Sequence, residues 1–331
     1  MDYLVRTLYA VTAVVTLAGR VPVGHAQAST GAPSPPQVLP VRYDEHRYVV
    51  VPVTEAGDTL YLYTDTGSDI NALWPASVER LGLMEDSLVR GNKTLRFTTL
   101  PPFRADASIP FDSPNPEIGR KILVLDPISF ALDTDGLLGR EWFADQVWTF
   151  DYPKHRLLLR SAGDLPRHSP KHRISVGFQV DAAGRRPFHF PRIRVRIDGD
   201  SLDLLFDTGA MTVLTDSARA ALGDGRPARR ATSFVVRSVF DRWRRRHPQW
   251  RVIEGADQLA DTTFPMIEVP ALDVGGFRVG PVWFTARPDQ NFVRFSQWMD
   301  QPIVGALGGS ALQYLRVTID YPKALAVFAR P

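Results

Sequence analysis

The sequence contains one short pattern twice: an apolar strand that ends in Asp-Thr-Gly. The first copy lies at residues 60–68 (LYLYTDTGS) and the second at residues 204–210 (LLFDTGA). Burial of each apolar strand brings an aspartate to the edge of a hydrophobic core, where a carboxylate without a partner is costly. One Asp-Thr-Gly carries little weight, because average composition produces it in about one chain in ten or twenty of this length. Two matched copies predict that Asp65 and Asp207 form one paired-carboxylate site.

The residues around the two copies also match. Each pattern is preceded by strands joined by a turn, at residues 48–64 and 192–206, and the second of these segments alternates apolar and charged residues as a half-buried strand does. Each pattern is followed by a short helical segment that closes on a glycine, Gly82 in the first copy and Gly223 in the second. The two halves of the chain are therefore predicted to contain the same β-rich unit.

The ends of the two units repeat as well. The first has DGLLG at residues 135–139 and the second has QPIVG at residues 301–305, each followed by a helical pattern. The tetrapeptide DYPK then follows at residues 151–154 and again at 320–323, where it predicts a turn between two strands. We interpret this as an internal duplication, with a first lobe at 45–160, a basic linker at 161–173 and a second lobe at 174–331.

This order of strand, Asp-Thr-Gly, short helix, apolar-apolar-Gly and DYP hairpin resembles the retropepsin-like unit of the aspartic peptidases, especially bacterial secreted members. Two units in one chain resemble the bilobed pepsin arrangement, and the resemblance covers about residues 45–331. It implies a mostly β, bilobed aspartic-peptidase fold made of two retropepsin-like β-barrel units with short helices.

The resemblance also implies a chemistry. In the family the two carboxylates face each other around one water and share one proton, as is established for the aspartic-protease dyad. The ionised member acts as general base on the water, and the protonated member polarises the scissile carbonyl. Asp65 and Asp207 would take these roles without a metal or a cofactor.

Further residues receive roles from the same resemblance. The loop glycines leave room for N–H groups near the carboxylates, the loop threonines tie each loop to the opposite lobe, and apolar-Gly pairs pack behind the loops. The Ser68 hydroxyl, which has no counterpart at Ala210, is expected to donate a hydrogen bond to the neighbouring carboxylate. The supporting residues are Thr66, Gly67, Ser68, Thr208, Gly209 and Ala210 in the loops, and Leu138, Gly139, Val304 and Gly305 behind them.

Two segments depart from the family pattern. The best candidate for a cleft-covering flap, residues 94–111, contains neither glycine nor tyrosine. The second lobe carries a helical insertion at about 224–265, in which residues 234–250 show the spacing of an amphipathic helix with a basic outer face. We interpret this face as solvated, with attraction to anionic envelope polymers or acidic substrates as the alternative.

The N-terminus resembles a secretory signal. Residues 1–28 combine Arg6, an apolar run at 8–19 and a small-residue cleavage site, Ala26-Gln27-Ala28. An uncleaved anchor or a mistaken start site is the alternative. Residues 29–44 are predicted to be a flexible leader, and the protein to be exported to the periplasm or secreted. The 331 residues include no cysteine, so no disulfide framework or thiol nucleophile is possible.

The sequence thus predicts an aspartic endopeptidase that acts as a monomer on a polypeptide bound extended between the lobes. We expect neither nucleic-acid binding nor stable membrane insertion after signal removal. One alternative is a catalytically weak or silent peptide-binding protein of the cell envelope with the same fold. Another, a glycosidase with paired carboxylates, has only the two acids in its favour.

Overall fold

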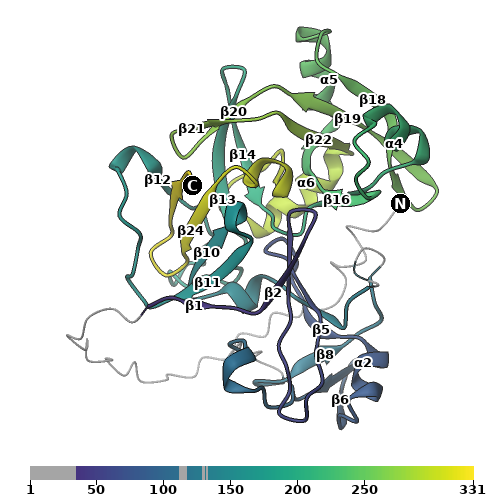
Figure 1. Ribbon diagram of the computed structural model, residues 1–331, viewed down its shortest axis with the longest axis vertical. Helices are drawn as coiled ribbons and strands as arrows, with labels where there is room; N and C mark the ends of the chain where they lie inside the picture. The colour runs from purple at the N-terminus through teal and green to yellow at the C-terminus, as the bar shows by residue number, and fades with distance from the viewer. Residues whose placement is uncertain (1–34, 112–117, 129–130, 132) are drawn as a thin grey trace.

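The computed structural model describes residues 35–111, 118–128, 131 and 133–331. The predicted signal segment therefore lies outside the described residues. Two large β-sheets, one from each half of the chain, lie at opposite ends of the molecule, and a smaller sheet lies between them (Figure 1). The prediction of a mostly β fold is confirmed.

The first sheet has eight strands and belongs to the part of the chain that we call the first lobe. In spatial order its strands are β2 (Val41–Asp44), β3 (Arg47–Val50), β4 (Leu62–Thr64), β9 (Gly136–Leu138), β5 (Asn71–Leu73), β8 (Ile122–Val124), β7 (Lys93–Thr98) and β6 (Glu85–Arg90).

The second sheet has nine strands and belongs to the second lobe. In spatial order these are β18 (Val252–Leu259), β19 (Thr262–Val269), β22 (Val282–Arg287), β17 (Ser233–Val236), β23 (Gly305–Leu307), β14 (Asp200–Phe206), β13 (Arg192–Ile197), β20 (Leu272–Val274) and β21 (Phe277–Val279). In both lobes the strand that leads into Asp-Thr-Gly pairs in parallel with the short strand that ends directly before the glycine of the apolar-Gly pair, β4 with β9 and β14 with β23. That short strand then pairs antiparallel with β5 in the first lobe and with β17 in the second.

The third sheet joins the lobes. Its strands, in order, are β1 (Gln37–Val38), β11 (Arg156–Arg160), β10 (Val147–Asp151), β24 (Arg316–Asp320), β25 (Leu325–Ala329) and β12 (Arg173–Ser175). Strands β10 and β24, one from each half, pair at its centre, where the buried hydroxyls of Thr149 and Thr318 lie 2.7 Å apart. Each DYPK segment makes the turn between two strands of this sheet, as predicted from the sequence.

Short helices fill the connections. The α-helices are α2 (Pro75–Arg80), α3 (Arg140–Phe143), α4 (Asp216–Leu222), α5 (Arg237–Arg246), α6 (Asp289–Phe295) and α7 (Gly309–Leu312), and the 3-10 turns are η1 (Ala105–Ala107), η2 (Tyr152–Lys154), η3 (Pro170–His172) and η4 (Ser296–Trp298). Helix α4 shows the expected end signals, because the Thr215 hydroxyl accepts the Ala218 N–H and Gly223 follows with a φ of 63°.

The largest of three hydrophobic clusters among the described residues runs through the molecule. Its buried side chains include Leu62 in the first sheet, Phe150 in the joining sheet and Phe206 and Phe284 in the second sheet. The rings of Phe150 and Phe206 lie 5.4 Å apart, so the core is continuous from the joining sheet to the strand that carries Asp207. This packing fixes the position of the strands, and with them the Asp-Thr-Gly segments that follow.

The predicted flexible leader at 29–44 needs correction for its described part. Residues 37–38 form β1 on β11, and residues 41–44 form β2 on β3. Proline suggested a loop here, but Pro36 and Pro40 lie just outside β1 and β2, so neither strand loses a ladder donor. Leu39 between them is buried and anchors the segment.

The predicted helical insertion at 224–265 also needs correction. Within it only residues 237–246 form a helix, while residues 233–236 are the central strand β17 and residues 252–259 are β18. Comparison of strand pairing shows that the extra segment of the second lobe is residues 211–232. It contains β15 (Met211–Val213), α4 and β16 (Arg229–Ala231), which lie between the second Asp-Thr-Gly and β17, and we call it the inserted segment.

The basic face of α5 is largely balanced by acids. Arg242 and Arg246 contact Asp200, Arg244 pairs with Glu254 at 2.5 Å, and Arg237 pairs with Asp241 within the helix. The inner face of the helix is buried through Val239, Phe240 and Trp243, as an amphipathic helix requires. These pairs favour the interpretation of a solvated face. No helix of the described residues has the length and apolar character to span a membrane.

Candidate active site

The two Asp-Thr-Gly loops meet between the lobes and are tied together by their threonines. The Thr66 hydroxyl donates to the Phe206 carbonyl oxygen at 2.6 Å and accepts the Thr208 N–H at 3.0 Å. In return, the Thr208 hydroxyl donates to the Thr64 carbonyl oxygen at 3.3 Å and accepts the Thr66 N–H at 3.1 Å. Each loop is thus fixed by the backbone of the other lobe, which is where the sequence placed both threonines.

The tie brings Asp65 and Asp207 together. Burial raises the pKa of both carboxyl groups above the ordinary value, and the charge of Asp65 raises the pKa of Asp207 further. A side-chain hydrogen bond between them lowers the pKa of Asp65 and raises that of Asp207. Two like charges this close do not ionise together readily, so the pair shares one proton.

The two loop glycines are required by space as well as by hydrogen bonding. The Gly67 N–H donates to Asp65 Oδ1 at 2.7 Å, and the Gly209 N–H donates to Asp207 Oδ1 at 2.9 Å. A Cβ on Gly67 would lie 2.9 Å from Asp207 Cγ, and one on Gly209 would lie 2.1 Å from Asp65 Cγ. Each glycine therefore leaves room for the carboxylate of the opposite loop.

The residues behind the loops are only partly those selected from the sequence. In the first lobe, the Asp65 N–H donates to the Leu138 carbonyl oxygen, and Gly139 follows, as predicted. In the second lobe, the Asp207 N–H donates to the Leu307 carbonyl oxygen, and Gly308 follows. The prediction of Val304 and Gly305 is therefore wrong, because the equivalent pair, Leu307 and Gly308, lies three residues later.

The error in register has a simple cause. The stretch from Val304 to Gly309 contains three glycines, so an apolar-Gly pair fits it in two frames. Strand pairing selects the later one, because Leu205 lies opposite Ala306 and Phe206 opposite Leu307. Gly305 is instead equivalent to Gly136 and packs against Phe234 of β17.

The predicted hydrogen bond from the Ser68 hydroxyl to the neighbouring carboxylate is not made among the described residues. Ser68 Oγ instead accepts the Ile70 N–H at 3.4 Å. The backbone N–H groups of Ser68 and Ala210, which both loops have in common, act on the carboxylates and favour their ionised forms. The hydrogen bonds that act on the two carboxylates are therefore more alike than the sequences of the loops suggest.

Sequence reasoning missed three residues that hold the loops. The Tyr63 hydroxyl donates to the Gly209 carbonyl oxygen at 2.8 Å, from the first lobe to the second. Asn71 Oδ1 accepts the Gly139 N–H at 2.7 Å, and Ser233 Oγ accepts the equivalent Gly308 N–H at 3.1 Å. Tyr63 was open to prediction, because side chains two residues apart on a strand share a face and Tyr63 precedes Asp65 by two.

A cluster of charged and aromatic residues lies beside the first loop. The Arg140 guanidinium is buried and lies 4.8 Å from the ring centres of both Phe188 and Phe190, which belong to the second lobe. Glu141 Oε2 lies 3.1 Å from His189 Nδ1, again between the lobes. Burial and the Arg140 charge act in opposite directions on Asp69, and burial prevails to raise its pKa to about 6.

The matching place beside the second loop is built differently. Gly309 occupies the position of Arg140, and a Cβ there would lie 2.5 Å from the His46 carbonyl oxygen. By strand register, His46 and His189 occupy equivalent positions, each three residues before a residue that pairs with the strand leading to Asp-Thr-Gly. In both lobes the segment just before β3 or β13 thus packs on the short helix of the opposite lobe.

The segment selected as a flap spans several elements. Residues 94–98 belong to β7, which pairs with β6 in a hairpin that turns at Gly91 and Asn92, before the selected segment begins. This hairpin joins its sheet through two residues, Phe97 and Thr98, which pair with β8. The equivalent hairpin of the second lobe, β18–β19, joins through four residues on β22. Residues 112–117 of the neighbouring loop lie outside the described part of the chain.

The described part of the chain contains no group of three or more His, Asp or Glu side chains arranged to hold a metal ion. What the site offers is a pair of buried carboxyl groups that share a proton, held by loops from two lobes. The chemistry open to such a pair is proton transfer to and from a bound water or an amide.

Comparison with known proteins bears on the fold. No family model matches the sequence, and no curated protein sequence matches it. Solved structures do match. One is the aspartic proteinase from Irpex lacteus, with a TM-score of 0.50 and 12% sequence identity, over 89% of this chain and 97% of that chain. At this identity the similarity concerns the fold, and we conclude that the chain has the pepsin-like fold of the aspartic proteinases.

Proposed function

We propose that the protein is an aspartic endopeptidase in which Asp65 and Asp207 activate one water for attack on a peptide bond. The observation that carries the proposal is the buried carboxyl pair: the two groups are hydrogen-bonded to each other, and both have raised pKa values. A pair of this kind that served only stability would be costly, because burial of acids disfavours their charged form. Perturbed acids at a junction of loops favour a catalytic role.

In the proposed reaction the monoanionic pair binds the water. The ionised member of the pair takes a proton from the water as the oxygen attacks the carbonyl carbon, while the proton on the other member stabilises the developing oxyanion. The proton taken from the water then passes to the leaving nitrogen when the C–N bond breaks. One proton remains on the pair at the end, so the cycle closes without a covalent intermediate.

The proposal extends to the state of the enzyme. We propose that the chain works as a monomer on an extended polypeptide, because both acids and both threonine ties lie in one chain. The shared strand pairing of the lobes supports an origin by internal duplication. We also propose export, with Ser29 as the first residue after cleavage at Ala28. N-terminal sequencing of the secreted protein tests the cleavage, and specific activity that is constant on dilution tests the monomer.

The experiment that tests the activity is a digest of denatured casein across pH with wild type and Asp207→Asn. Wild type is expected to release peptides with a bell-shaped pH profile, and the variant is expected to lose activity by several orders of magnitude while keeping its fold. Asp151→Asn is a matched control, since Asp151 is a buried carboxylate paired with Arg156 in the joining sheet. Peptidase activity retained in Asp207→Asn would contradict the mechanism.

A peptide-binding protein without turnover is the second candidate. It is favoured by the absence of tyrosine both from the β6–β7 hairpin and from residues 94–111, the segment first selected as a flap. A statine-type peptide distinguishes the two functions, because its hydroxyl can take the place of the attacked water. Tight binding of that peptide together with no casein hydrolysis at any pH would establish the second candidate.

A further inference from the structure

The chain after the second catalytic loop leaves the sheet that supports the first. In the first lobe, Asn71 begins β5 four residues after Gly67, and β5 lies directly between β9 and β8. In the second lobe, the equivalent place between β23 and β22 is taken by β17, which begins at Ser233. The residues that follow Ala210 form β15 instead, which pairs with β16 in a separate two-stranded sheet. The second loop therefore lacks the sheet support that the first loop has.

A buried carboxylate supports the chain after the second loop instead. Asp257 Oδ1, on β18, accepts the Thr212 hydroxyl at 2.6 Å and the Val213 N–H at 2.9 Å. Leu214 forms a bridge with the same residue, and the Thr215 N–H donates to the Ala256 carbonyl oxygen. These contacts fix the chain from two residues after Ala210 onward.

Asp257 is itself held on its other side. Arg287 Nη2 donates to Asp257 Oδ2 at 2.5 Å, and both side chains are almost completely buried. The Arg287 guanidinium lies 4.3 Å from the ring centre of Phe234 and 4.9 Å from that of Phe264. A buried ion pair is weak evidence of a stabilising role, because desolvation offsets its attraction. Its clearer property is a fixed geometry, since each partner would be left as an unpaired charge if it moved.

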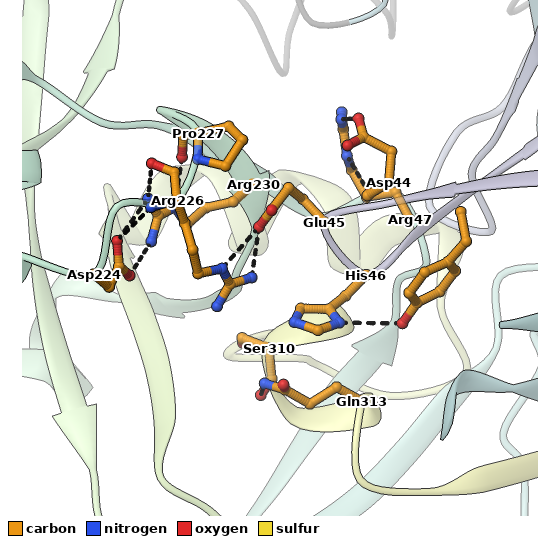
Figure 2. A network of polar contacts seen from close by, with 11 residues as sticks. Asp44, Glu45, His46, Arg47, Asp224, Arg226, Pro227, Arg230, Ser310 and Gln313 are labelled. Carbon is orange, nitrogen blue, oxygen red and sulfur yellow. Dashed lines mark hydrogen bonds and ion pairs between the residues drawn. The ribbon is translucent and has the colours of Figure 1, made fainter. Parts of the chain in front are cut away.

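The inserted segment is held from the first lobe as well. The Ala231 N–H donates to the Glu45 carbonyl oxygen at 3.1 Å. Arg226 pairs with the Glu45 carboxylate at 2.5 Å, and Figure 2 shows the two side chains facing each other. Arg47 Nη1 lies 3.6 Å from the sulfur of Met211, the residue directly after Ala210. The turn between β2 and β3 thus contacts the inserted segment at both β15 and β16, while Asp257 contacts it from β18.

From this arrangement we infer that Asp257, oriented by Arg287, is a positioning residue for the second catalytic loop, replacing the support that β5 gives the first. The inference rests on the proposed function, in which the place of Asp207 matters for chemistry. The Gly209 N–H bond to Asp207 and the Ala210 carbonyl bond from Thr232 lie within a few residues of Thr212. Loss of the Thr212 contact is therefore expected to loosen the loop without changing either catalytic acid.

The test removes one hydroxyl. Thr212→Val keeps the shape of the side chain and loses the donor to Asp257, while Thr212→Ser keeps the donor. Thr149→Val is the matched control, because Thr149 is equally buried and its hydroxyl pairs with Thr318 in the joining sheet. Hydrogen–deuterium exchange over residues 207–214 is measured first, together with the affinity for a statine-type peptide, since neither readout needs turnover.

Thr212→Val is expected to exchange faster over residues 207–214 and to lose about tenfold in kcat with little change in KM, because misplacement of a catalytic group acts on the chemical step. Thr212→Ser is expected to restore both, and Thr149→Val to change neither. Exchange and kcat that match Thr149→Val would overturn the inference. If wild type shows no hydrolysis, the proposed function fails, and exchange over residues 207–214 still decides whether Asp257 holds the loop.

Discussion

The two Asp-Thr-Gly loops are nearly identical in their contacts, whereas the segments that follow them differ completely. Each loop sends a threonine hydroxyl to a backbone oxygen of the other lobe, and each glycine lies against the opposite carboxylate. After the first loop the chain enters its sheet at once as β5. After the second it makes the inserted segment, residues 211–232, and only then enters the sheet as β17.

This difference separates what the chemistry requires from what the fold tolerates. The residues within contact of the two acids repeat, because two carboxylates that share a proton need the same space and the same donors on both sides. The position of β5 and β17 in the sheet also repeats, since an empty place between two strands would leave their backbone groups unpaired. The path of the chain between these two fixed points is free to vary, as loops are.

The largest expected effect concerns the two glycines. Gly209→Ala would place a Cβ 2.1 Å from Asp65 Cγ, and Gly67→Ala would place one 2.9 Å from Asp207 Cγ. We expect each to lower kcat/KM by at least about 100-fold, because the carboxylates must move apart, and Gly209→Ala to be the worse of the two. Gly82→Ala is the control: its φ is +60° with open space around it, so it should cost about 1–2 kcal/mol of stability and no activity. Equal activity in all three variants would contradict the close approach of the loops.

The threonine tie is expected to show a smaller asymmetry. Thr66 donates at 2.6 Å and Thr208 at 3.3 Å. Replacement of either by valine should cost about 1–3 kcal/mol of unfolding free energy, because it leaves buried backbone groups without partners, with the greater loss in Thr66→Val. Denaturant unfolding measures both, and the double variant should cost less than the sum, since the two hydroxyls serve one contact. Strict additivity would mean that the loops are held independently.

These features differ in how far the sequence could predict them. The acids, glycines and threonines were predictable, because an apolar strand followed by Asp-Thr-Gly leaves few alternatives and occurs twice. The support of the second loop was not, because the match of Gly82 with Gly223 aligned α2 with α4, whereas strand order aligns α2 with α5. Phe234 and Val235 fit a helical pattern and a strand equally well, as short apolar runs do. The pairing of β17 with β22 and β23, which only the fold supplies, decides between them.

A third test measures how ionisation of the two acids changes the stability of the folded protein. Burial raises the pKa of Asp65 and Asp207 above the ordinary 3.8. Between that value and the raised values the folded protein therefore binds more protons than the unfolded chain, so stability falls as pH rises through this interval. The loss is complete once the pH exceeds the raised values.

Asp65→Asn and Asp207→Asn should each weaken this fall, because each removes one ionisable group and the repulsion on the other. We expect the Tm of either variant, measured by calorimetry, to exceed that of wild type increasingly as pH is raised from about 4 towards neutrality, since one pKa unit corresponds to about 1.4 kcal/mol. Tm curves that run parallel for wild type and variants would show that the pair is not a source of strain.

The smallest effect is expected where the two loop sequences differ, at Ser68 and Ala210. A hydroxyl that donated to the carboxylate would favour its ionised form, and its loss would move the high-pH limb of activity upward. Ser68 Oγ instead accepts the Ile70 N–H at 3.4 Å, and the backbone N–H groups shared by both loops act on the acids. Ser68→Ala should therefore shift the limb by less than about 0.4 pH unit, the equivalent of a weak neutral hydrogen bond of ~0.5 kcal/mol. An upward shift of a full pH unit would show that the Ser68 hydroxyl turns to the carboxylate when substrate binds. The two loops would then differ more in the substrate complex than in the free protein.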